Sequence, residues 1–158
     1  MNKKQLTELV IIPTLKQIPK GYSEEAVMAT QMIFAHESKG AEFIRQEGCC
    51  GDVGAFGPAQ VEKFTHDQTW LYGDSIWDNA LLLKIIDHDE YIAKVHPPVE
   101  RLIYDLRYNV FMARQKLFMA AGALPKTPED MAHYLKKHWN GDGKATPTKY
   151  YFDYINWR

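Results

Sequence analysis

Residues 36–66 read HESKGAEFIRQEGCCGDVGAFGPAQVEKFTH, and this stretch interrupts an otherwise helical sequence. Half of the chain's 10 glycines fall between residues 38 and 66: Gly40, Gly48, Gly51, Gly54 and Gly57. Clustered glycines mark turns and loops, and long irregular loops in compact domains are often functional. The stretch therefore predicts an irregular or β-containing lobe over about residues 38–66.

Apolar residues recur at helical spacing on both sides of this lobe. Ser23 before Glu24 and Glu25 predicts an N-cap and a helix that runs to about residue 36. The same reasoning predicts a short helix over residues 6–12 that Pro13 ends, a helix from residue 74 or 75 to about 95, one from about 106 to 122, and one that starts at Thr127. The expected fold class is mainly α, with one α+β element at the lobe.

Length and composition are those of a single globular domain over residues 1–158, with 46% hydrophobic and 25% charged residues. The net charge of −1 offers no sequence-wide basic field, so nucleic acid is not an expected partner. No apolar run approaches the roughly 20 residues of a membrane span, so membrane insertion is not expected. The N-terminus lacks the pattern of a secretory signal, which predicts synthesis and folding in a cytoplasm.

The sequence gives no sign of a metal or cofactor. Cys49 and Cys50 are adjacent, a placement that strains a disulfide between them. The six histidines form no HExxH pattern, and CxxC, P-loop, G-x-S-x-G and G-x-G-x-x-G motifs are absent from the sequence. We therefore expect neither a metal site nor a bound cofactor.

Glu37 is the strongest candidate for a catalytic residue in this sequence. It falls on the apolar face at the C-terminal end of its predicted helix, where desolvation and the helix dipole both raise a carboxyl pKa. A carboxyl that keeps its proton near neutral pH can act as a general acid. On position alone, a solvated glutamate at a frayed helix end is the simpler explanation of the residue.

The order of motifs supports the catalytic interpretation. Glu37-Ser38 ends a helix, residues 54–65 read GAFGPAQVEKFT, Asn109-Val110 falls near the start of a helix, and residues 139–143 read WNGDG. This series resembles the Glu-Ser signature, the G-A-x-G-L-M-Q-I-x-P-x-T segment, the Asn-Ile element and the A-Y-N-A-G-x-G turn of lytic transglycosylases and goose-type lysozymes. The residues around these motifs are most similar to those of phage-encoded members.

The chain departs from the family pattern at several points. The segment between Glu37 and Gly54 is longer than usual. The remaining departures are replacements: Asp52-Val53 for the usual serine, Pro58-Ala59 for Leu-Met, Lys63 for proline, and Trp139 for tyrosine. These changes affect expected substrate contacts more than the expected catalytic acid.

The resemblance implies a lysozyme-like fold with a cleft between the helical body and the lobe. It implies that Glu37 protonates the leaving oxygen of a β-1,4 bond between N-acetylmuramic acid and N-acetylglucosamine and then acts as a base. Attack by water would make the protein a lysozyme, and attack by the C6 hydroxyl of the muramic acid a lytic transglycosylase. The residues expected to contact substrate are Ser38, Gln60, Asn109, Trp139 and Asn140. Asp52 and Glu62 are candidates for a second carboxylate.

The expected partner is the glycan strand of peptidoglycan, with other virion proteins as further candidates, and the expected place of action is the bacterial wall. A rival hypothesis is a lysozyme-like module without turnover that serves a virion or binds the wall, which the near-neutral charge favours. A third is a helical adaptor with a chance motif. The C-terminal aromatics are expected to dock on the core or on a partner: Tyr150, Tyr151, Phe152, Tyr154 and Trp157.

Overall fold

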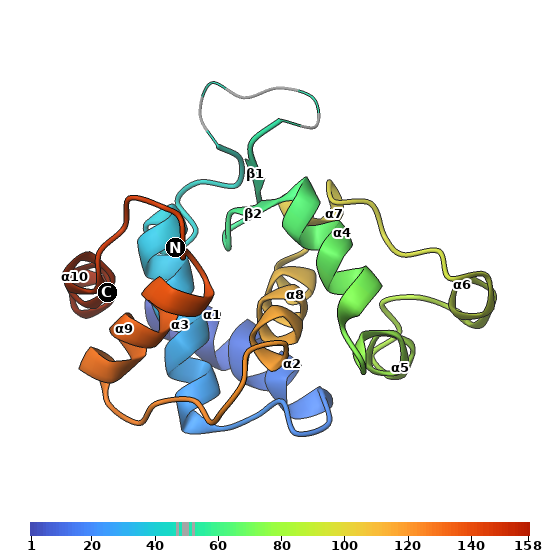
Figure 1. Cartoon of the computed structure of the whole chain (residues 1–158), viewed down its shortest axis with the longest axis horizontal. Helices are drawn as coiled ribbons and strands as arrows, with labels where there is room; N and C mark the ends of the chain where they lie inside the picture. Colours follow the sequence, from blue (N-terminus) through green and yellow to red (C-terminus); the bar gives the residue numbers. More distant parts are fainter. Residues whose placement is uncertain (47, 49–50, 52) are drawn as a thin grey trace.

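The computed structural model describes residues 1–46, 48, 51 and 53–158. The described chain is mainly helical, with one two-stranded antiparallel sheet, which confirms the expected fold class (Figure 1). Cys49, Cys50 and Asp52 lie outside the described residues. The interpretation of the cysteine pair and of Asp52 as a second carboxylate therefore stays a prediction.

In chain order, helices precede and follow one small two-stranded sheet. Their bounds are α1 (Lys3–Leu6), the π-helix η1 (Thr7–Ile11), α2 (Ile12–Gln17), α3 (Glu24–Ser38), β1 (Ala55–Phe56), β2 (Val61–Glu62), α4 (Lys63–Tyr72), α5 (Ile76–Leu82), α6 (His88–Ala93), α7 (Arg101–Tyr104), α8 (Leu106–Phe118), α9 (Pro128–His138) and α10 (Pro147–Asn156). In Figure 1, α3, α9 and α10 form the left side, α4 to α6 the right side, and the sheet lies at the top.

Helices α3 and α8 form the centre of the core. Most of α3 is buried, and it packs against α8, α9 and α10. Helix α8 is buried along nearly its whole length and also contacts α2, α4 and α7. One hydrophobic cluster joins residues from both sides of the molecule, including Phe34, Trp70 and Phe111, each about 0–1% exposed. The packing of α3 against α10 places the last turn of α3 beside Tyr150.

Two of the expected helix starts are confirmed by side-chain caps. Ser23 accepts a hydrogen bond from the backbone N–H of Ala26, and Thr127 accepts one from Asp130. Pro128 occupies the first turn of α9, where its missing N–H costs nothing. These signals act within four residues and do not depend on tertiary packing.

The structure corrects three expected boundaries. Pro13 does not end the first helix, because the π-turn in η1 pairs Ile12 N–H with Thr7 O and α2 continues to Gln17. The expected helix over residues 75–95 is split into α5 and α6. Lys84 takes a left-handed conformation after α5, and Asp87 starts α6 with a capping box. The irregular lobe also ends earlier than residue 66, because α4 already begins at Lys63.

The lobe is held together by Arg45 and the short hairpin. Strands β1 and β2 pair Ala55 with Glu62 and Phe56 with Val61. The Arg45 guanidinium lies 3.7 Å above the Phe56 ring and donates to the carbonyls of Gly51, Val53 and Ala55 at 2.6–2.9 Å. The side chain thus organises a segment that has little sheet structure of its own.

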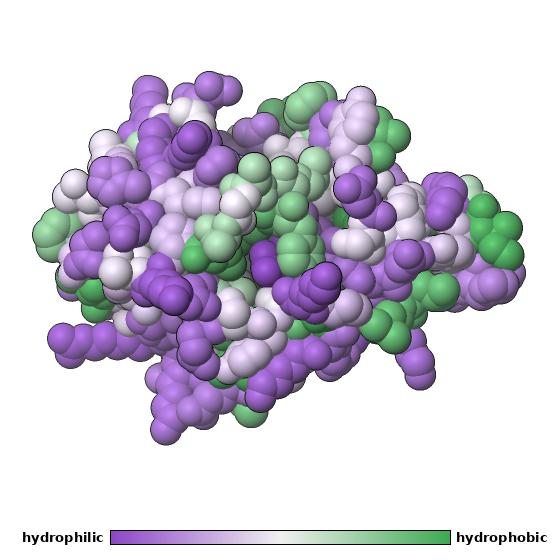
Figure 2. Space-filling model, turned by 60° about the horizontal axis from the view of Figure 1, so that its bottom comes forward, coloured by the Kyte–Doolittle hydropathy of each residue, from purple (hydrophilic) through white to green (hydrophobic). Residues whose placement is uncertain are grey.

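The molecular surface is mixed in character. Figure 2 brings the bottom of the molecule forward and shows hydrophilic residues over most of this face, with hydrophobic ones near its centre and at the right-hand end, where α6 lies in Figure 1. Ile92 of α6 is 66% exposed. Within the part of the chain that the structure describes, no helix has the length and apolar character required to cross a bilayer.

Candidate active site

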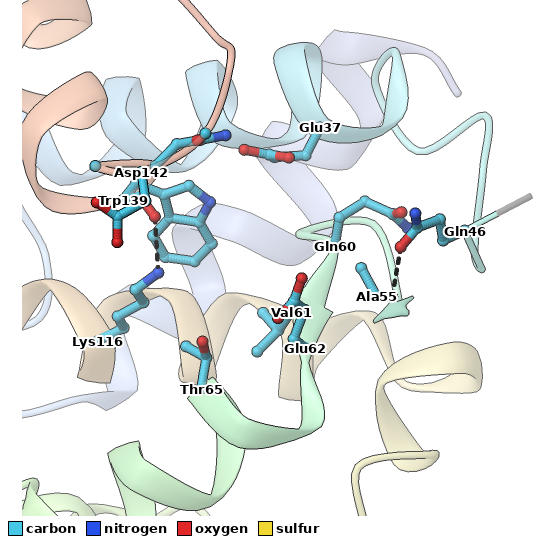
Figure 3. Close-up of a pocket in the computed structure, with 13 residues that line it drawn as sticks. Glu37, Gln46, Ala55, Gln60, Val61, Glu62, Thr65, Lys116, Trp139 and Asp142 are labelled. Atoms are coloured by element: carbon cyan, nitrogen blue, oxygen red, sulfur yellow. Dashed lines mark hydrogen bonds between the residues drawn. The ribbon is translucent and has the colours of Figure 1, made fainter. Parts of the chain in front are cut away.

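A cleft of about 680 Å³ lies between the lobe, the end of α3, α8 and the turn that follows α9 (Figure 3). One wall comes from residues around the hairpin, namely Gln46, Ala55, Gln60, Val61, Glu62 and Thr65. The opposite wall comes from the turn over residues 139–143, with Glu37 and Lys116 between the two walls. The cleft is large enough for part of a saccharide chain, since small-ligand sites typically occupy about 300–1,000 Å³.

Glu37 occupies the last turn of α3 and points into the cleft (Figure 3). The Tyr150 hydroxyl donates a hydrogen bond to its Oε1 at 2.9 Å. Burial raises the pKa of Glu37, and this effect outweighs the opposing hydrogen bonds from Tyr150 and Asn140 and the charges of His36 and Lys116. The site therefore favours a carboxyl that retains its proton to higher pH than an exposed glutamate does.

Tyr150 comes from α10 and is fully buried. Its ring lies 3.9 Å from the ring of His36, and His36 Nδ1 is 2.7 Å from Oδ2 of Asp153, one turn further along α10. Burial and the neighbouring Glu37 carboxyl raise the pKa of Tyr150, so the hydroxyl stays a donor. Two residues at the end of α3 are thus each matched by a residue of α10.

Lys116 reaches the cleft from α8. Its Nζ donates to the Trp139 carbonyl at 3.0 Å and lies 4.0 Å from the centre of the Trp139 ring. Burial lowers the pKa of Lys116 to about 8, although the charges of Glu37 and Glu62 act in the opposite direction. The cleft therefore contains a desolvated cation close to the candidate acid.

Hydrogen bonds from Lys136 stabilise the turn over residues 139–143. Its Nζ donates to the carbonyls of Asn140, Gly141 and Gly143 at 2.8, 3.1 and 2.7 Å. A Cβ at Gly143 would lie 1.4 Å from Asn140 Oδ1, so any side chain there would displace the Asn140 amide. This packing holds the Asn140 amide toward Glu37 and Tyr150.

Gln60 stands at the tip of the hairpin in a left-handed conformation, with φ 48°. Its Nε2 donates to the Gly57 carbonyl at 2.8 Å. Asn109 lies behind this turn: its Oδ1 faces the Ala59 N–H at 3.4 Å, and its Nδ2 donates to the Leu102 carbonyl at 2.6 Å. Asn109 therefore supports the turn that presents Gln60 to the cleft.

The structure brings together most of the residues predicted to form a site. Glu37, Gln60, Glu62, Trp139 and Asn140 all line the cleft. Ser38 and Asn109 do not line it. Each is fully buried, and the Ser38 hydroxyl donates to the Phe34 carbonyl and accepts from the Ala41 N–H, which closes the end of α3. Both serve the shape of the site rather than contact with a ligand.

Sequence reasoning missed several residues of the site, of which four carry polar groups that matter for its chemistry. Lys116, Gln46 and Asp142 line the cleft, and Tyr150 contacts Glu37. Tyr150 was expected to dock on the core, and it does so at the candidate acid. For Lys116, the spacing of seven residues from Asn109 was the available signal, because it places both side chains on the same side of α8.

A second group of titratable residues lies outside the cleft. His66, Asp67 and His96 have ligand atoms within 4.8 Å of one another. His66 Nε2 is 2.7 Å from the Tyr108 hydroxyl, which also accepts from Trp70, and His66 Nδ1 is 2.9 Å from Asp67. The Tyr108 hydroxyl can donate to His66 Nε2, which leaves the proton of His66 on Nδ1, facing Asp67, so that both nitrogens of this ring have a hydrogen-bond partner.

Comparison of the chain with family models, with curated proteins and with solved structures returned no match. The resemblance to lytic transglycosylases and goose-type lysozymes therefore rests on the motifs in the sequence alone.

If Glu37 acts as the predicted general acid, replacement of Tyr150 with phenylalanine is expected to lower the rate of bond cleavage about tenfold, the value of one hydrogen bond to a reacting group. Since this hydrogen bond lowers the pKa of Glu37, its loss should also move the alkaline limb of the pH–rate profile to higher pH. Tyr154→Phe is the matched control, because Tyr154 lies on the same helix outside the cleft. A profile of Tyr150→Phe that matches wild type would contradict the assignment.

Proposed function

We propose that the protein cleaves the glycan strand of peptidoglycan with Glu37 as general acid and base, on a lysozyme-like arrangement of helical body, lobe and cleft. The observation that carries this proposal is the Glu37 carboxyl, which lines a cleft of about 680 Å³ and has a pKa raised by burial. The ordered motifs around Glu37, Gln60 and the 139–143 turn support the same chemistry. The proposal includes action at a bacterial wall and a phage origin.

Cleavage begins with transfer of the Glu37 proton to the glycosidic oxygen, which lets the sugar leave. Tyr150 and Asn140 then stabilise the carboxylate, because their hydrogen bonds favour the charged form of Glu37. The carboxylate next removes a proton from the attacking hydroxyl, whose oxygen forms a bond to the anomeric carbon of the muramic acid. If that hydroxyl belongs to water, the product has a reducing end, and if it is the C6 hydroxyl of the same muramic acid, the product is a 1,6-anhydro sugar.

The choice between these two outcomes depends on a second carboxylate. Glu62 and Asp142 line the cleft on opposite walls from each other, the first beside the hairpin and the second in the 139–143 turn. Hydrolysis would need one of them to hold the attacking water, whereas the intramolecular reaction needs no second carboxylate. Their presence in the cleft supports testing both products.

The deciding experiment is digestion of purified peptidoglycan by the intact chain, followed by mass spectrometry of the soluble fragments. Anhydro-muropeptides are the expected product of a lytic transglycosylase and reducing-end fragments that of a lysozyme. Walls of several chemical types serve as substrates, and Glu37→Gln serves as the blank. Binding to the wall without soluble fragments would instead support the rival role of a wall-binding or virion module, which the net charge of −1 favours.

A further inference from the structure

Lys116 carries a charge for which the described part of the protein supplies no direct counter-ion. Its Nζ contacts the Trp139 carbonyl and ring, and no described carboxylate oxygen lies within 4.0 Å of it. Buried charges in proteins are normally paired. An ammonium with only a carbonyl and an aromatic face as partners is therefore incomplete in a desolvated site.

The free side of this ammonium faces the cleft. An ammonium has three N–H donors, and the contacts to Trp139 use one of them and cover one side of the group. Lys116 lines the same cleft as Glu37, and its Nζ points up into the space that these residues enclose (Figure 3). A ligand in the cleft thus meets the ammonium directly.

The surrounding charges restrict which ligand fits. The carboxylates whose charges act on Lys116 are Glu37 from α3 and Glu62 from the hairpin, and Asp142 from the turn after α9 lines the same cleft. A neutral carbonyl or hydroxyl oxygen of a ligand can accept a hydrogen bond from the ammonium, as the Trp139 carbonyl does, but only an anionic oxygen also supplies the missing counter-charge. An anionic group of a ligand that contacts the Lys116 ammonium, and stays away from the carboxylates of the cleft, would provide the counter-ion that Lys116 lacks.

We infer that Lys116 is an anion-binding residue of the cleft and that it takes a carboxylate of the glycan that occupies the cleft. The identity of the glycan rests on the proposed function. In peptidoglycan such a carboxylate comes from the free lactyl group of N-acetylmuramic acid or from the peptide attached to that group. Lys116 then selects the acidic sugar over N-acetylglucosamine and fixes which residue lies beside Glu37.

The test measures binding of three probes to the intact chain by NMR titration or calorimetry. N-acetylglucosamine has no carboxylate, N-acetylmuramic acid carries it on the lactyl group, and N-acetylmuramoyl-L-alanyl-D-isoglutamine carries it on the peptide. For wild type we expect one of the two acidic probes to bind about tenfold more tightly than N-acetylglucosamine, as for a hydrogen bond to a charged group. The preferred acidic probe identifies the source of the carboxylate.

In Lys116→Gln this preference should fall to about one, and Lys116→Arg should keep part of it, because the guanidinium retains the charge. Lys144→Gln is the control, since Lys144 is exposed and does not line the cleft. Equal binding of all three probes by wild type, or an unchanged preference in Lys116→Gln, would overturn the inference.

A pH series on wild type avoids any question of folding in the variants. The pKa of Lys116 is about 8, so the ammonium is charged below that pH and neutral above it. The preference for the acidic probe should be present at about pH 6 and lost at about pH 10. Binding can be tested without bond cleavage, so the two proposals can fail separately. A protein that prefers the acidic probe but does not cleave peptidoglycan would refute the proposed function alone. A protein that cleaves peptidoglycan without this preference would refute only the role of Lys116.

Discussion

Glu37→Gln is expected to lower the rate of peptidoglycan cleavage by about a thousandfold, within the range of positioned acid–base catalysis. The substitution keeps the size of the side chain and its place among Tyr150 and Asn140, and it removes the proton that the leaving oxygen needs. Release of soluble fragments, followed over time at several enzyme concentrations, measures the loss. Glu42→Gln is the matched control, because Glu42 is exposed and lies outside the cleft.

A rate for Glu37→Gln within a few-fold of wild type would remove Glu37 from the mechanism and make Glu62 and Asp142 the next candidates. The wild-type pH profile supplies an independent check. The acid works only while it is protonated, so activity should fall as pH rises through the pKa of Glu37. Because that pKa is raised in the folded protein, this fall should begin above the ordinary range of a glutamate.

The same shift predicts an effect on stability. A carboxyl whose pKa is raised by folding favours the folded state at low pH, and this contribution is lost as pH rises through the folded pKa. Above that range the wild-type protein holds an ionised, desolvated carboxylate. Glu37→Gln should therefore match wild type in Tm near pH 4 and exceed it near pH 8, as expected of a group kept for function.

Features set by neighbouring residues could be predicted from the sequence. Ser23 and Thr127 cap their helices through hydrogen bonds to residues three positions later. The glycine-rich lobe was also predicted, since turn residues act locally. Pro13 misled the prediction because its effect depends on whether the preceding turn can widen into a π-helix, and η1 does so.

Contacts between distant residues could not be predicted in the same way. Tyr150 and Glu37 are 113 positions apart, and neither spacing nor composition relates them. The motif resemblance placed Asn109 in the site, but the side chain points at the backbone of the hairpin turn rather than into the cleft. A motif thus indicates which residues the site requires. It does not distinguish the residues that contact a ligand from the residues that position them.

Gly57→Ala is expected to be strongly destabilising. Gly57 has φ +71°, and an added Cβ would lie 2.3 Å from Asn109 Oδ1 and 2.4 Å from the Leu102 carbonyl oxygen. A left-handed alanine costs about 1–2 kcal/mol, and overpacking adds about 1–3 kcal/mol. A total of about 3 kcal/mol corresponds to a Tm roughly 10 °C lower for a chain of this size.

Gly122→Ala separates the two contributions. Gly122 has φ +90° with nothing within 4 Å of an added Cβ, so the variant carries the conformational cost without the collision. Its Tm should fall by only a few degrees. The two variants should also differ in function, because Gly57 accepts hydrogen bonds from the Gln60 backbone N–H and side chain, and a displaced Gly57 moves Gln60 out of the cleft wall. If both variants lose the same stability, the close approach of Asn109 to Gly57 does not hold the hairpin turn, and the supporting role assigned to Asn109 fails with it.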